Sequence, residues 1–168
     1  MDCTLRGHAL RKGRVSLPGQ VYLITTVTND RRPYFRHLRA GLCVVATLIA
    51  QSEEGYSKTL AYVVMPDHLH WLMVLEDGSA LPEVVSWVKS SSSRRIRALT
   101  DGLAGFRWQR GFHDHAIRSN EDLRAAARYV VSNPLRAGLV ERIGDYSLWD
   151  AAWLNGAAPV RPEGHAVS

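Results

Sequence analysis

Apolar residues follow two different periods along this chain. In four stretches, the last of them less regular, they alternate with polar residues, as in half-buried β-strands. In three others they recur at intervals of three and four residues, as in amphipathic helices. The predicted strands are 20–28, 58–65, 68–76 and 106–118. The predicted helices are 37–54, 81–99 and a third that begins after Ser119 and stops at Pro134.

The order of these elements predicts the fold class. The sequence β-α-β-β-α-β is typical of an α+β, ferredoxin-like antiparallel sheet with helices on one face, here followed by a C-terminal helix. A chain of 168 residues is long enough for one domain with a real core, for which we expect residues 20–155. Residues 1–19 then form a basic arm, and the tail 156–168, rich in Ala, Pro and Gly, is expected to be disordered.

The helix after Ser119 has two distinct faces. Acidic residues fill its first turn, and Pro134 is expected to end it. Its apolar stripe consists of Leu123, Ala126, Ala127 and Val130. Tyr129 and Asn133 lie outside this stripe and are four residues apart, hence on one face. A phenol beside an amide oxygen could supply a nucleophile and a metal ligand together; the alternative is a tyrosine with a packed ring and a solvated hydroxyl.

Two histidines open the strand predicted at 68–76. His68 and His70 are separated by one apolar residue, and because side chains in a strand alternate between faces, both rings point the same way. Their Cα atoms would lie roughly 6 to 7 Å apart, so two neutral imidazoles could share one cation. Taken alone, such a pair more often lies on a half-exposed sheet face without binding anything. A second pair, His113 and His115, flanks a charged residue, and we interpret it as substrate-positioning or structural.

Composition narrows the kind of partner and the compartment. The formal charge of +5 and the pI near 9.6 favour a polyanionic partner. The two cysteines, Cys3 and Cys43, provide neither a disulfide framework nor a Cys-based metal site. No apolar run approaches about 18 residues and the N-terminus has no hydrophobic signal core, so we expect a cytoplasmic protein without a membrane span.

Basic residues concentrate in two segments, the arm and the second half of the helix predicted at 81–99. In the helix the cations are accompanied by hydroxyls and by no acid, so they could follow a phosphate backbone, although a solvated basic face fits the sequence equally well. Nearby aromatics such as Phe106, Trp108 and Phe112 could stack unpaired bases. The candidate DNA-binding residues in the two segments are Arg6, Arg11, Lys12, Arg14, Lys89, Arg94, Arg95 and Arg97.

Three motifs carry a family resemblance. They are MPDHLHW at 65–71, GFHDHAIR at 111–118 and YVVSNPLRAGLV at 129–140. In order and spacing they closely resemble the REP-associated tyrosine transposases, which belong to the IS200/IS605-like single-tyrosine HUH enzymes. The resemblance runs from about residue 13 to residue 150. Many relatives have a glutamine four residues after the tyrosine, where this chain has Asn133.

The resemblance implies a mechanism and a set of site residues. Tyr129 would be the nucleophile that forms a 5′-phosphotyrosine link, with a Mg²⁺ or Mn²⁺ ion held by His68, His70 and Asn133. Such an ion, bound by neutral ligands, can polarise the scissile phosphate. The second and third motifs add His113, His115 and Arg136 to the candidate DNA-binding residues.

The expected function is that of a transposase, a metal-dependent endonuclease and strand transferase that acts on single-stranded DNA with REP-type hairpins. We expect it in the cytoplasm, associated with the nucleoid, as a monomer or a homodimer. Two alternatives stay open. One is a domesticated protein that binds DNA hairpins without cutting them, and the other is a small zinc-dependent hydrolase that uses His68 and His70 with His113 or His115.

Overall fold

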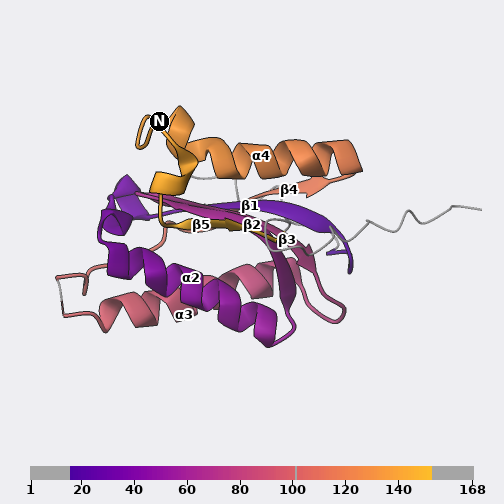
Figure 1. Ribbon diagram of the computed structural model, residues 1–168. Helices are drawn as coiled ribbons and strands as arrows, with labels where there is room; N and C mark the ends of the chain where they lie inside the picture. The colour runs from indigo at the N-terminus through magenta and orange to yellow at the C-terminus, as the bar shows by residue number, and fades with distance from the viewer. Residues whose placement is uncertain (1–15, 101, 153–168) are drawn as a thin grey trace, which may run out of the picture.

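A computed structural model describes residues 16–100 and 102–152 of the chain (Figure 1). These residues contain five strands, three α-helices and three short 3-10 helices. The strands are β1 (Val21–Val27), β2 (Ser57–Met65), β3 (His68–Leu75), β4 (His113–Ile117) and β5 (Trp149–Ala151). The α-helices are α2 (Leu38–Glu53), α3 (Leu81–Arg97) and α4 (Asn120–Arg136). The 3-10 helices are η1 (Asn29–Arg31), η2 (Tyr34–Arg36) and η3 (Ile143–Asp145).

The strands form one antiparallel sheet in the order β4-β1-β3-β2-β5. Its first four strands have the predicted ferredoxin-like arrangement, which is therefore confirmed. The strand predicted at 106–118 is shortened to β4, because Gly111 adopts a left-handed backbone with φ of 75° and Trp108 makes only an isolated bridge to Thr28. Three-residue β5, which pairs with the outer edge of β2, was not predicted.

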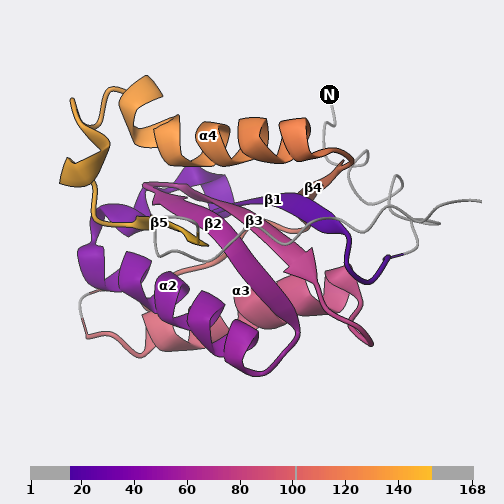
Figure 2. The ribbon, with the colours of Figure 1, turned by 45° about the vertical axis from the view of Figure 1, so that its right-hand side comes forward.

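The two faces of the sheet carry different helices. Helices α2 and α3 cover one face, whereas α4 crosses the other (Figures 1 and 2). Alternate residues of β3 supply both cores. Leu69, Trp71 and Met73 are buried with α2 and α3, and Leu72 and Val74 are buried with the apolar stripe of α4. The predicted stripe of the last helix is confirmed, since all four of its residues are buried.

Pro134 does not end α4, contrary to the prediction. The helix continues to Arg136, because a proline this close to the C-terminus removes only one late backbone donor. The helix ends when Gly138 turns left-handed with φ of 69° and donates its N–H to the carbonyl of Leu135. The last helical turn therefore remains intact around Asn133 and Arg136.

The residues before β1 are tied to the sheet and to α3. The Ser16 hydroxyl accepts a hydrogen bond from the backbone N–H of Leu81 at the start of α3, and Gly19 donates to the carbonyl of Leu75. The arm candidates Arg6, Arg11, Lys12 and Arg14, and the tail 156–168, lie outside the described residues. Within the part that is described, no helix is both long and apolar enough to span a membrane.

Candidate active site

The His-x-His pair lies at the start of β3, on the α4 face of the sheet. The rings of His68 and His70 have centroids 4.7 Å apart and planes inclined at 81°. His70 is 6% exposed, whereas His68 is half-buried. The alternation predicted from the sequence therefore brings both imidazoles to one face, where an ion could approach them.

A hydrogen bond orients each of these imidazoles. Asp67 Oδ1 lies 2.6 Å from Nδ1 of His68, and Thr25 Oγ1 lies 2.8 Å from Nδ1 of His70. Arg31 Nη1 in turn donates to Asp67 Oδ2 at 3.3 Å. Because both Nδ1 atoms are engaged, Nε2 of each ring is the nitrogen left to bind a metal, which is the usual arrangement of metal-binding histidines.

The pKa values of His70 and Asp67 fit this arrangement. Burial, together with the positive charge of His68 and Arg136, lowers the pKa of His70 to about 4. That imidazole is thus neutral, with a lone pair to offer, at physiological pH. Burial alone would raise the pKa of Asp67, but the hydrogen bonds and positive charges of His68 and Arg31 outweigh it and lower that pKa.

Tyr129 projects from α4 toward the same histidines. Its ring centroid lies 5.3 Å from that of His70, with the planes inclined at 72°, and the residue is 40% exposed. Arg136 is seven residues later, so it returns to the same side of the helix, and its Cζ lies 4.2 Å from the Tyr129 ring centroid. A phenol reachable from solvent therefore stands beside the histidine pair of its own chain, with a guanidinium on its ring.

Asn133 lies one turn after Tyr129, on the buried side of α4. Its Nδ2 donates to the backbone carbonyl of Tyr129 at 3.0 Å, so the amide nitrogen is engaged and Oδ1 remains as a neutral oxygen donor. Within residues 16–100 and 102–152, no three His, Cys, Asp or Glu side chains are grouped to hold a metal. A metal bound by His68 and His70 therefore needs a third ligand of another type, and the Asn133 amide is of that type.

Comparison with known proteins identifies the family. Residues 18–133 match the family model described as "Transposase IS200 like". The chain belongs to the IS200-like transposase family. The family-level expectation from the three motifs is thereby confirmed, and with it the expectation of a transposase.

Individual relatives carry more specific names. A REP-associated tyrosine transposase of Escherichia coli K12 is 32% identical over 88 residues, which span 51% of this chain and 49% of the relative. A Haemophilus influenzae protein of the same REP-associated group is 29% identical over 140 residues, 76% of this chain and 77% of the relative. The solved structure of a REP-associated tyrosine transposase bound to a REP hairpin superposes with a TM-score of 0.68 at 23% identity, covering 81% of this chain and 79% of that one.

The remaining candidate residues of this IS200-like chain fall in different places. Helix α3, with its basic second half, lies on the opposite face of the sheet from α4 (Figures 1 and 2), the helix that carries Tyr129. There Lys89 donates to the carbonyls of Gln109 and Gly111, and Arg97 donates to that of Phe106. Arg94 bonds Ser91, and Arg95 is exposed at the same end of the helix. These cations therefore partly serve to hold the segment before β4.

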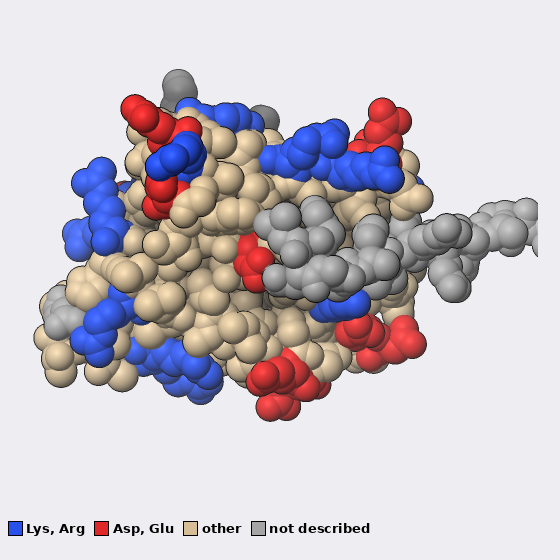
Figure 3. Space-filling model, viewed as in Figure 1, with Lys and Arg blue, Asp and Glu red and all other residues tan. Residues whose placement is uncertain are grey.

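Other basic side chains gather along α4, at the top of Figure 3. Of the candidates from the sequence, Arg136 lies on this helix and at the site itself. His113 and His115 lie on β4, at the edge of the sheet, and are exposed. Because β1 separates β4 from β3, His113 is two strand spacings, about 10 Å, from His70. Neither His113 nor His115 forms a three-residue metal group with His68 and His70 in the part of the chain that the structure describes, so the geometry does not favour the zinc hydrolase.

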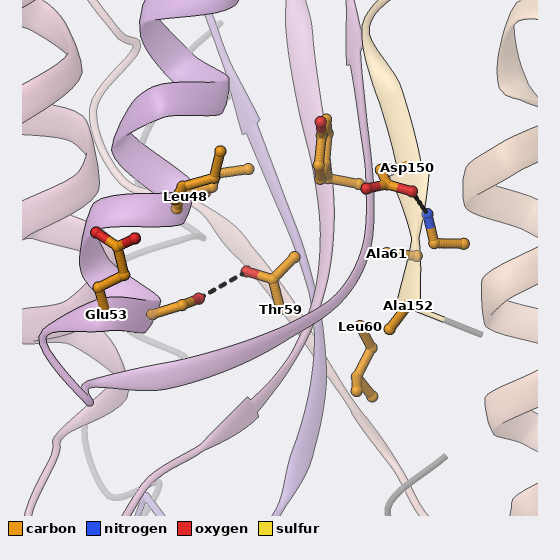
Figure 4. Close-up of a pocket in the computed structure, with 11 residues that line it drawn as sticks. Leu48, Glu53, Thr59, Leu60, Ala61, Asp150 and Ala152 are labelled. Atoms are coloured by element: carbon orange, nitrogen blue, oxygen red, sulfur yellow. Dashed lines mark hydrogen bonds between the residues drawn. The ribbon is translucent and has the colours of Figure 1, made fainter. Parts of the chain in front are cut away.

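A separate pocket of about 460 Å³ lies between α2, β2 and β5 (Figure 4). Its lining includes Leu48, Thr59 and Asp150, none of which belongs to the candidate site. Tyr62 also lines it, and burial and then the charge of Asp150 raise the pKa of Tyr62 to about 12, so this phenol stays protonated and unreactive. This pocket is therefore separate from the candidate site on the α4 face.

Sequence reasoning missed Asp67, Thr25 and Arg31 as supports of the histidines. Asp67 could have been found, because it immediately precedes His68 and a carboxylate next to a metal-binding histidine commonly orients it. Thr25 gives no local signal, since it meets His70 only through the pairing of β1 with β3. Arg31 likewise reaches Asp67 from the end of η1, thirty-six residues away in sequence.

Proposed function

We propose that this protein is a metal-dependent single-stranded DNA endonuclease and strand transferase that acts on REP-type hairpins through a 5′-phosphotyrosine at Tyr129. The observation that carries the proposal is the 5.3 Å separation between the rings of Tyr129 and His70. A nucleophile must stand next to the group that handles the phosphate, and here a solvent-accessible phenol does so within one chain. The named relatives and the hairpin-bound structural neighbour support the choice of DNA.

His68, His70 and Asn133 would hold the metal ion, Mg²⁺ or Mn²⁺ as in the family. The fit rests on the two Nε2 atoms left by the Nδ1 hydrogen bonds and on the Asn133 oxygen left by the Nδ2 hydrogen bond. All three donors are neutral, so a bound divalent ion would keep its charge and act as a Lewis acid on the scissile phosphate. Asp67 and Thr25 would fix the two rings in the orientation that this requires.

Tyr129 then performs the covalent chemistry. Its Oη attacks the phosphorus in line, the bond from phosphorus to the 3′ oxygen breaks, and the phenolic proton is lost as the leaving 3′ oxygen gains one from solvent. The products are a phosphotyrosine linked to the 5′ end of the downstream fragment and a free 3′-hydroxyl on the upstream fragment. Attack by a 3′-hydroxyl reverses the step and joins strands without any other energy source. The Arg136 guanidinium beside the ring would meet the phosphate's negative charge.

The basic segments would bind the rest of the DNA. We propose that Arg6, Arg11, Lys12 and Arg14 of the arm, with Lys89, Arg94, Arg95 and Arg97 of α3, contact phosphates, so that affinity falls steeply with salt. Deleting residues 1–14 should flatten the salt dependence measured by fluorescence anisotropy. The folded domain 20–155 would supply the chemistry. The cytoplasm, near the nucleoid, is the compartment where such a substrate occurs.

The proposal is tested by trapping the covalent intermediate. The protein is incubated with Mn²⁺ and end-labelled single-stranded DNA that carries a REP-type hairpin, and a protein–DNA adduct is sought by denaturing electrophoresis. The adduct should form with the wild type and with Tyr56→Phe, a tyrosine of similar exposure at 37%, and be absent with Tyr129→Phe. Binding without an adduct in the wild type would favour the non-cutting hairpin-binding protein instead.

The strand state of the substrate offers a further check. A phenol fixed on a helix can meet a scissile phosphate in line only if the DNA bends toward it, and unstacking a duplex costs a few kcal/mol per step. Single-stranded DNA avoids that cost. We therefore expect little or no adduct with the same sequence as a perfect duplex, and efficient cutting of the duplex at matched salt would contradict the proposed substrate.

A further inference from the structure

A row of side chains connects the active site to the edge of the sheet. In the strand register Thr25 of β1 pairs with His70 on one side and with His113 of β4 on the other. Side chains of paired residues in an antiparallel sheet point to the same face, so this row lies on the α4 face and spans about 10 Å. Thr25 also touches the site directly, through its hydrogen bond to Nδ1 of His70.

The next row extends the same surface. Leu23 pairs with Leu72 on one side and with His115 on the other. His113 and His115 are exposed, and Leu23 and Thr25 are half-buried between them and the site. We call these four residues the β1–β4 shelf.

Helix α4 covers only the inner part of the shelf. Its buried stripe packs with residues of β2 and β3, including Leu60 and Leu72, and Leu23 packs against the same core, whereas His113 and His115 remain exposed. Ala116 packs with the opposite core, as expected from the alternation of β4, and the same alternation turns Asp114 away from the shelf. The shelf thus presents two imidazole rings beside a small apolar floor and no carboxylate of its own strands.

We propose that the β1–β4 shelf binds the unpaired nucleotides that adjoin the scissile phosphate, with their bases against His113 and His115. Imidazole rings and an apolar floor suit the faces of unstacked bases, which single-strand binding proteins hold on aromatic side chains. The location selects this part of the DNA, because the shelf begins at Thr25, which bonds His70, and ends at His113, about 10 Å from His70. This inference rests on the proposed function and specifies the part of the substrate that the site holds.

The experiment places 2-aminopurine, a fluorescent base, at each unpaired position beside the hairpin. All binding is measured in a Tyr129→Phe background, so that no strand is cut. The shelf variant combines His113→Ala with His115→Ala, the rescue variant replaces both with Phe, and the control is Leu42→Ala, exposed on α2 beyond the opposite face of the sheet. Because both histidines are exposed, none of these changes is expected to unfold the protein.

Stacking on the shelf predicts a specific pattern. A probe next to the cleavage position should be quenched on binding to the parent and to the Phe variant, and much less with the Ala variant. The Ala variant should also bind the flanked hairpin about 5- to 20-fold more weakly, a modest part of the stacking energy of two bases, and bind a hairpin without the flank as the parent does. Leu42→Ala should change nothing.

Other results distinguish the shelf proposal from the proposed function. Equal quenching in the Ala variant and its parent, or equal weakening with and without the flank, would overturn the shelf proposal. A wild type that forms the covalent adduct while the shelf variants bind normally would leave the proposed function standing and remove the shelf alone. Flank-specific binding by a protein that forms no adduct would support the shelf and refute the catalytic role of Tyr129.

Discussion

The two faces of β3 have different roles. Toward α2 and α3 the strand presents Leu69, Trp71 and Met73, all fully buried in apolar surroundings. Toward α4 it begins with His68 and His70 and becomes apolar only at Leu72. One face therefore holds the fold together, and the other offers polar groups at the end where α4 brings Tyr129. The rigid apolar face is what keeps the histidines in place, since both faces belong to one strand.

The largest expected effect is a loss of stability at Trp71, in contrast to a loss of function at the neighbouring His70. Trp71→Ala should lower the free energy of unfolding by about 3–5 kcal/mol, because it leaves a cavity and removes the donor to Thr59 Oγ1. The neighbouring His70→Gln, close in volume, should cost less than about 1.5 kcal/mol yet abolish adduct formation. Urea unfolding and the adduct assay check both. Similar stability losses at the two positions would break the distinction between the faces.

His70 should contribute to the pH dependence of stability. Its pKa is lowered to about 4 in the fold by burial and by the charges of His68 and Arg136, against about 6.5 when unfolded. As the pH falls, the unfolded chain therefore takes up the proton first. The contribution of His70 to the free energy of unfolding, up to about 3 kcal/mol, is thus complete above about pH 6.5 and is lost as the pH falls toward 4. We would measure urea unfolding at pH 7 and pH 4.5 with a chelator present. Between these pH values the free energy of unfolding should fall less for His70→Gln than for the wild type. An unchanged loss would contradict the assignment.

A smaller effect is expected from the residues that orient the histidines. Thr25→Val keeps the shape of the side chain but removes the partner of His70 Nδ1, and Asp67→Asn weakens that of His68. Each should reduce Mn²⁺ affinity by about 10- to 100-fold, or about 1.4–2.7 kcal/mol. Isothermal titration calorimetry measures this directly. Thr26→Val, a buried neighbour, is the matched control for Thr25, and the same loss there would point to general disruption of β1.

The smallest effect concerns the cation on the nucleophile's ring. Arg136→Lys keeps the charge but loses the planar stacking on Tyr129, which is worth about 0.5–1 kcal/mol at a partly exposed site. Adduct formation at saturating DNA should slow by about 2- to 5-fold. Arg128→Lys, about two turns before Arg136 and exposed on α4, should form the adduct at the wild-type rate. Loss of DNA affinity with no change in the saturated rate would assign Arg136 to phosphate binding alone.

Much of this fold could be predicted, because local periodicity controls it. The alternation in β1 to β3 and the stripe of α4 are properties of consecutive residues, and they place the His-x-His pair and Tyr129 on the right kinds of element. The predictions were wrong where tertiary contacts determine whether an element forms or where it ends. Three-residue β5 exists only because β2 offers an edge, and Pro134 is accommodated because α4 ends soon after it.

The candidate site could likewise be predicted only in part. The histidines and the tyrosine carry their own signals, since spacing fixes their faces. Thr25 does not, because only the pairing of β1 with β3 brings its hydroxyl to His70. The β1–β4 shelf is also a product of register, which joins residues of β1 and β4 that lie far apart in the chain.

The central claim is that Tyr129 works with the histidines of its own chain, and a mixing experiment tests it most directly. Tyr129→Phe lacks the nucleophile, and the double variant His68→Ala with His70→Ala lacks the metal ligands, so neither should form the DNA adduct alone. The 5.3 Å ring separation within one chain predicts that the mixture is equally inactive. Recovery of the adduct on mixing would show that the tyrosine serves a partner's histidines and would contradict the account.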